Sequence, residues 1–168
     1  TAHGPLAANF MDPVHLDAYK AAVGALLEVC GAVGATVLVQ HSGRVPAAPP
    51  TEIERLHAME RDALRGLADI GARHGVKLAV ETLWVFGRGQ YTATAARLAE
   101  EIRAIDHPFV CGTLDFSHVY LHSTFLGLDF RAQIEAFAPV TGHLHVHDSF
   151  GRPKLTAMHA PSEELAFG

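Results

Sequence analysis

Short apolar runs alternate along this chain with longer segments whose apolar residues recur at helical spacing. The runs are rich in β-branched and aliphatic residues and short enough to be buried strands. Residues 1–7 are interpreted as the end of a strand and its loop, and further strands are predicted over 35–40, 76–83, 109–116 and 141–147. A helical segment separates each run from the next, so a strand begins every roughly 30 to 40 residues. The pattern therefore predicts a repeated strand–helix unit.

Helix start and stop signals delimit the predicted helices. Side chains that cap or begin a helix are Asp12, Pro13, Thr51, Glu54 and Asp129. Residues that end a helix are Gly31, Gly34, Gly75 and Pro139. Thr51 and Glu54 have the spacing of a capping box, in which each side chain satisfies the free backbone N–H of the other. A further helix is predicted over 94–105.

Strand–helix units of this kind require parallel strands and right-handed crossovers. Two architectures fit, an open doubly wound sheet and a closed (β/α)8 barrel. The chain has 168 residues and about five units, whereas a whole barrel takes about 250 residues. Length alone therefore favours the open sheet. In either case we expect residues 1–168 to form a single domain.

Composition narrows the functional class. Hydrophobic residues make up 49% and charged residues 18%, which is typical of a globular protein and excludes a disordered one. A net charge of −5 without a basic run disfavours a nucleic-acid partner. No apolar stretch is long enough to span a membrane, so no membrane partner is expected. Cys30 and Cys111 lie in apolar segments and indicate buried thiols in a reducing compartment, which predicts a cytoplasmic protein.

Side chains able to bind a metal or transfer a proton follow the predicted strands at their carboxyl ends. In chain order they are His3, His41, Glu81, Asp115 and His145. These strand ends form the edge at which parallel α/β folds build their sites, so we expect the side chains to meet there. Their mixture of nitrogen and oxygen donors suits Zn²⁺ or Mn²⁺ better than Ca²⁺. Glu81 follows an apolar run, and a buried carboxylate needs a cation or a metal as partner.

The other histidines either lie near these strand ends or are predicted to be solvated. His118 follows Asp115 by three residues, and an Asx turn or helix cap is the alternative interpretation of Asp115. The last strand carries His143, His145 and His147 on one face and is followed by Asp148, and we expect His143 to pack within the sheet. The histidines predicted to be solvated are His15, His57, His74, His107, His122 and His159.

Five short motifs in a fixed order resemble those of the xylose isomerase-like TIM barrels, a family that also includes endonuclease IV. The motifs are HGP (3–5), VQHSG (39–43), AVET (79–82), LDFSH (114–118) and HVHD (145–148). The resemblance covers nearly the whole chain. It implies a (β/α)8 barrel that is partial here, with the first and last strands missing.

The resemblance also implies a divalent-metal site at the top of the barrel. In the isomerase and epimerase branch, Glu81, Asp115 and His145 match metal ligands, and His118 matches a contact to a substrate hydroxyl. The family's fourth ligand, a glutamate on the last barrel strand, has no counterpart in this sequence.

In the endonuclease branch, His3, His41 and His118 would be further ligands of a multi-zinc centre. The Asp-x-His pair that endonuclease IV-like members carry after the strand of His145 is absent from this sequence. His147 and Asp148 are additional candidates for contacts to a metal or substrate.

The leading hypothesis is an isomerase or epimerase of a sugar or small hydroxy-ketone. A divalent metal (Mn, Zn, Mg or Co) would act as a Lewis acid, with Glu81 as ligand and base and His118 helping to hold an enediolate. In the loop 83–93, Trp84, Phe86 and Tyr91 are predicted to pack on a sugar face.

Two other functional classes remain open. One is a zinc phosphodiesterase acting on abasic DNA, which His3 and His41 favour. The other is a non-catalytic incomplete barrel that binds metal or assembles with other chains. A partial barrel exposes two strand edges, so we also expect a homo-oligomer.

Overall fold

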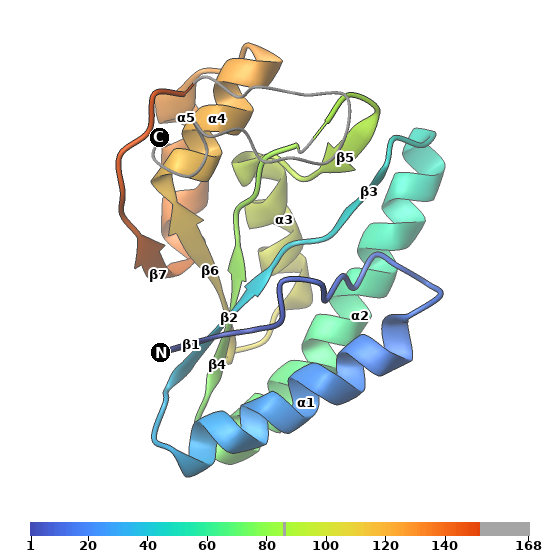
Figure 1. Cartoon of the computed structure of the whole chain (residues 1–168), viewed down its shortest axis with the longest axis vertical. Coiled ribbons are helices and arrows are strands. Elements are labelled where there is room, and N and C mark those ends of the chain that lie inside the picture. Colours follow the sequence, from blue (N-terminus) through green and yellow to red (C-terminus); the bar gives the residue numbers. More distant parts are fainter. Residues whose placement is uncertain (86, 152–168) are drawn as a thin grey trace.

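Five parallel strands in chain order form the main sheet (Figure 1). The computed structural model describes residues 1–85 and 87–151. The strands are β1 (Ala2–His3), β2 (Val37–His41), β4 (Lys77–Glu81), β6 (Val110–Asp115) and β7 (Thr141–His145). A separate antiparallel pair consists of β3 (Arg44–Pro46) and β5 (Gln90–Thr92).

Helices connect successive strands of the main sheet. They are α1 (Leu16–Ala32), α2 (Pro50–His74), α3 (Ala95–Ile105), α4 (Phe116–Leu126) and α5 (Phe130–Phe137), followed by a short 3₁₀ helix, η1 (Ala138–Val140). A doubly wound sheet reverses its strand order at a switch point, whereas this sheet keeps the order β1-β2-β4-β6-β7 throughout. The preference for an open sheet from length alone is therefore wrong, and the fold is part of a (β/α)8 barrel.

The two faces of the sheet have different roles. Leu38, Leu78 and Leu114 pack with the helices in one buried apolar core. Because side chains alternate along a strand, Glu81 and Asp115 point to the opposite face, which corresponds to the inside of the barrel. The alternation thus separates the core from the candidate site.

A close approach between α5 and β6 completes the core. Phe137 is fully buried, and a Cβ at Gly112 would overlap its ring. Glycine at position 112 therefore lets the ring of Phe137 lie directly against the strand.

Several local predictions differ from the structure. The first helix begins at Leu16, because Asp12 accepts a hydrogen bond from the Val14 amide and forms a turn instead of a cap. The second helix begins at Pro50 without a side-chain cap, and Glu54 pairs with Arg97, so the predicted capping box is wrong.

Three further elements were not predicted. The helix α4 follows β6 directly, and its sequence lacks the apolar stripe that marks the other helices. Strands β3 and β5 lie in the Pro-rich and Gly-containing loops, where they are stabilised by pairing with each other.

Asp129 caps α5 as predicted, by accepting a hydrogen bond from the Ala132 amide.

Three of the histidines predicted to be solvated are buried or partly buried. His57 and His122 are only 1% and 3% exposed, and the His107 ring accepts a hydrogen bond from the Phe109 amide. His15 and His74 are exposed as predicted, and His159 lies outside the described residues.

Cys30 and Cys111 are free thiols, buried and half-buried respectively, and burial raises the pKa of both. No helix in the described part of the chain combines the length and apolarity needed to cross a membrane.

The burial of His122 predicts a pH-dependent loss of stability. Burial lowers the pKa of His122 from 6.5 to about 4, although a hydrogen bond with the backbone of Leu83 acts in the opposite direction. The unfolded chain takes up this proton near pH 6.5 and the folded chain only near pH 4, so stability falls as the pH decreases through this range.

We expect the wild type to lose about 2 kcal/mol more unfolding free energy between pH 7 and pH 5 than His122→Leu. Urea unfolding of both proteins at the two pH values measures this difference. Equal losses in the two proteins would contradict the assignment.

Candidate metal centre

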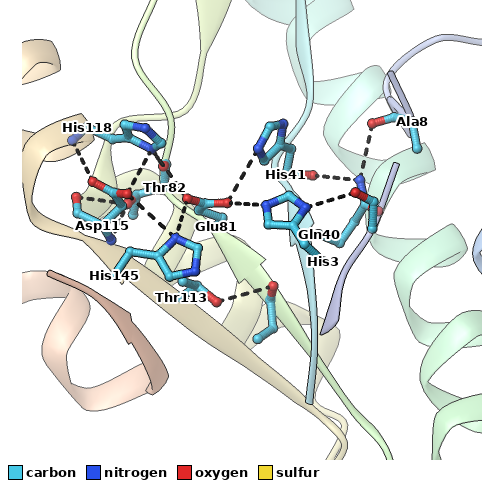
Figure 2. Close-up of polar contacts among 12 residues, drawn as sticks. His3, Ala8, Gln40, His41, Glu81, Thr82, Thr113, Asp115, His118 and His145 are labelled. Atoms are coloured by element: carbon cyan, nitrogen blue, oxygen red, sulfur yellow. Dashed lines mark hydrogen bonds and ion pairs between the residues drawn. The ribbon is translucent and has the colours of Figure 1, made fainter. Parts of the chain in front are cut away.

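The strand register brings the predicted site residues to one edge of the sheet. His41 on β2 lies opposite Glu81 on β4, and Asp115 on β6 lies opposite His145 on β7. Parallel strands place their carboxyl ends side by side, so residues far apart in the sequence become neighbours. Figure 2 shows Glu81 between two pairs of histidine rings, one pair on each side.

Glu81 is the centre of this cluster and is only 2% exposed. Its Oε2 atom lies 3.2 Å from His3 Nε2 and 3.4 Å from His41 Nε2. Its Oε1 atom lies 2.9 Å from His145 Nδ1 and 3.5 Å from His118 Nδ1. Each carboxylate oxygen therefore faces two imidazoles.

The two carboxylate oxygens of Asp115 have different roles. Oδ1 accepts a hydrogen bond of 2.9 Å from the His118 amide and caps α4. Oδ2 lies 3.1 Å from His147 Nε2 and 3.6 Å from His145 Nδ1. The helix-cap interpretation of Asp115 is therefore correct, and the second oxygen still faces the cluster.

Burial keeps two of these histidines neutral near pH 7. It lowers the pKa of His41 to about 4, with the charge of Glu81 acting in the opposite direction. It also lowers the pKa of His118, against the charges of Asp115 and Glu81. Neutral imidazole is the form that binds metals.

The tautomer of His118 follows from its backbone partner. The Nδ1 atom lies 2.9 Å from the Thr82 carbonyl oxygen, which can only accept, so Nδ1 carries the proton. Nε2 then has a free lone pair. A ligand hydroxyl could donate a hydrogen bond to it.

The residues present fit a divalent cation. Three overlapping groups have one ligand atom from each member within 4.8 Å of one another: His3, His41 and Glu81; Asp115, His118 and His147; and Glu81, Asp115 and His145. Two carboxylates are shared between groups, and histidines supply the ion-pair partners found for them among the described residues. Buried carboxylates surrounded by imidazoles form a donor set for Zn²⁺, Mn²⁺ or a similar ion.

The remaining predicted residues lie at different distances from this cluster. The Trp84 ring packs against His118 with a centroid distance of 4.2 Å. Asp148 is exposed, and its carboxylate accepts a hydrogen bond from the Ser149 amide. His143 is half-buried, with its ring 5.3 Å from that of His145. Phe86 lies outside the described residues.

Two residues of the region have roles that sequence reasoning missed. Thr82 accepts a hydrogen bond from the Asp115 amide through Oγ1 and binds His118 through its carbonyl, so it links Asp115 to His118. Its position directly after Glu81 at a strand end is a signal that could have identified it. Tyr91, predicted to contact a sugar, places its hydroxyl 2.7 Å from His57 Nε2 on α2, a contact that the sequence did not indicate.

Comparison with known proteins gives the family and the fold. A family model described as xylose isomerase-like TIM barrel matches residues 1–164. A D-tagatose 3-epimerase-like protein superposes with a TM-score of 0.74 at 20% identity, over 89% of this chain and 56% of the other. For 3-keto-D-glucoside 4-epimerase from E. coli the TM-score is 0.69 at 21% identity, over 88% and 58%.

A xylose isomerase-like TIM barrel protein from Mycobacterium smegmatis, solved in complex with magnesium, has a TM-score of 0.69 at 15% identity, over 88% of this chain and 51% of that one. A search of curated proteins found no match. This chain thus spans a little over half the length of the first structures that it resembles. The family model covers almost all of the sequence, and the chain belongs to the xylose isomerase-like TIM barrel family.

Proposed function

We propose that this chain binds one divalent metal through Glu81, Asp115 and His145 and serves an isomerase or epimerase of a sugar or small hydroxy-ketone. The supporting observation is the convergence of two carboxylates, each 2% exposed, with His145 at the carboxyl ends of three neighbouring strands. Three protein ligands would leave a coordination position for a substrate or water, as catalytic metal sites require.

A bound divalent ion would supply Lewis acidity to a carbonyl and its neighbouring hydroxyl. Glu81 is the candidate proton acceptor. His3 and His41 contact its Oε2 atom, and its Oε1 atom faces His145 in the proposed metal site. His118 would accept a hydrogen bond from a substrate hydroxyl at Nε2. Trp84, packed against His118, would cover one face of the substrate and exclude water.

The substrate class is inferred from relatives. Two neighbours are described as a D-tagatose 3-epimerase-like protein and a 3-keto-D-glucoside 4-epimerase, whose names indicate keto-sugars. This chain spans little more than half of each, and the fourth ligand expected for the family has no counterpart in its sequence. Because of these two differences, we propose substrate turnover by the 168 residues alone as a separate claim, which the substrate screen below tests.

Metal analysis of the purified protein tests the proposal directly. We expect one equivalent of Mn or Zn per chain after loading and dialysis, and loss of that equivalent in Asp115→Asn. Glu135→Gln, which changes an exposed carboxylate on α5, is the matched control and should keep the metal. A loaded protein with one metal would then be screened with D-tagatose, D-psicose and D-fructose. Absence of bound metal in the wild type would refute the proposal.

A second candidate is a multi-zinc phosphodiesterase, favoured by the group His3, His41 and Glu81. The same metal analysis separates the two, because about three zinc ions per chain would support the phosphodiesterase. The net charge of −5 favours the small-molecule substrate over DNA.

A non-catalytic, incomplete barrel is the third alternative. Within the described residues, β1 and β7 are the sheet edges, and Leu144 on β7 is 50% exposed. Homo-oligomerisation through these edges and a cytoplasmic location remain proposals. Size-exclusion chromatography with light scattering tests the first of them.

A further inference from the structure

A second cluster of buried polar side chains lies outside the candidate metal centre. His57 and Glu60 on α2 are 1% and 3% exposed, and Glu101 on α3 is 5% exposed. Glu101 is paired with Arg61 and Arg97 at the outer side of this cluster. Glu60 instead faces the loop that follows β2, where its buried carboxylate binds the backbone.

Glu60 binds the backbone two residues after His41. Its Oε1 atom accepts a hydrogen bond of 2.6 Å from the Gly43 amide, and this contact is buried. The Gly43 carbonyl accepts a hydrogen bond of 2.8 Å from Thr92 Oγ1 on β5. The preceding amide, that of Ser42, donates to the Glu81 carbonyl at 3.2 Å. The turn after His41 is therefore bound from α2, β4 and β5 at once.

The turn is closely packed at Gly43. A Cβ at Gly43 would overlap the side chain of Met11, which is fully buried, and would come 2.9 Å from Glu60 Oε1. An amide hydrogen bond to a carboxylate is roughly twice as strong as one between neutral groups. Gly43 is therefore held by its hydrogen bond to Glu60 and by close packing against Met11.

The same helix also binds the neighbouring strand pair. His57 Nε2 lies 2.7 Å from the Tyr91 hydroxyl, and Tyr91 on β5 pairs with Val45 on β3. Successive turns of α2 therefore contact the turn that precedes β3, through Glu60, and strand β5, through His57.

The loop between β4 and β5, which carries Trp84, begins at the metal centre and ends at this strand pair. Helix α2 is thus connected to two loops of the site without contributing a ligand to it.

We propose that Glu60 is a positioning residue for His41. Its carboxylate holds the Gly43 amide, fixes the turn after β2 and thereby keeps the His41 ring against Glu81 Oε2. The consequence for binding rests on the proposed metal site. The consequence for the position of His41 does not.

Zinc affinity provides the first test, measured by competition titration on the full chain. Glu60→Met keeps the side-chain length but removes the acceptor, and we expect Zn²⁺ to bind about 10- to 100-fold more weakly. Glu60→Gln keeps an oxygen that accepts from the Gly43 amide and should restore affinity close to the wild-type value. Glu101→Gln is the matched control, because it changes the same buried cluster without touching Gly43, and it should bind Zn²⁺ as the wild type does.

The second test needs no metal. In NMR spectra of the metal-free protein, Glu60→Met should shift the His41 ring resonances and speed hydrogen exchange at the Gly43 amide, whereas Glu101→Gln should not. If Glu60→Met does not fold, Gly43→Ala adds a Cβ that overlaps Met11 and crowds Glu60 Oε1, so it displaces the same turn and should produce the same changes. Wild-type zinc affinity together with unchanged His41 resonances would overturn the proposal. If the wild type binds no Zn²⁺, the metal site fails, and the His41 resonances alone decide the role of Glu60.

Discussion

Glu81→Gln should abolish metal retention and lower any turnover by about 10²- to 10⁴-fold. The substitution keeps the shape of the side chain but replaces a charged oxygen at the centre of four imidazoles by an amide. A carboxamide is a poor metal ligand and cannot accept a proton from carbon. Metal content by elemental analysis and initial rates on the substrate found by screening measure the two effects separately.

The matched control for Glu81→Gln is Glu135→Gln, whose carboxylate is exposed and paired only with Arg131 among the contacts described. It should retain both metal and activity. If Glu81→Gln kept its metal and its rate, Glu81 would be neither ligand nor base. Retention of metal with loss of rate would assign Glu81 to proton transfer alone.

Phe137→Ala should lower the free energy of unfolding by about 3–5 kcal/mol. The ring of Phe137 is fully buried and lies directly over Gly112 on β6, so its removal leaves a cavity between α5 and the sheet. The backbone at Gly112 cannot move to fill this space without breaking its pairing with β7. Urea unfolding monitored by circular dichroism measures the loss.

Phe125→Ala is the matched control for this change, because Phe125 on α4 is 37% exposed. Its loss of stability should be a small fraction of that for Phe137→Ala. Similar losses for the two variants would contradict the assignment of Phe137 to the core.

Much of the candidate site could be predicted because it depends on the ends of strands. A buried parallel strand is a short apolar run, and the polar residue that ends it is conspicuous, as Glu81 is after β4 and Asp115 is after β6. The helix cap on Asp115 and its place in the cluster were both anticipated, as alternatives that the structure combines. Thr82 was missed because its role depends on the backbone of the next strand over.

The buried polar cluster of α2 could not be predicted in the same way. His57 and Glu60 fall at the helical spacing of the buried face of α2, but both are polar, and nothing local indicates that the turn at Gly43 and the hydroxyl of Tyr91 are their partners. Likewise, β3 and β5 became strands because two loops meet and pair, not because either has a strand pattern. Helix α4 lacks an apolar stripe and is ended by Gly127 in a left-handed conformation after Asp115 has capped its start.

By itself, the sequence determined the repeated strand–helix unit, the places of the five parallel strands and the identity of the side chains at their carboxyl ends. These features follow from periodicity and burial, which act over a few residues at a time. The tertiary structure alone decided the strand order, which distinguishes a barrel from an open sheet, and the partners of each buried polar group. Both depend on which distant segments come into contact, and hydrogen bonds such as that from Gly43 to Glu60 form only after packing has placed the two together.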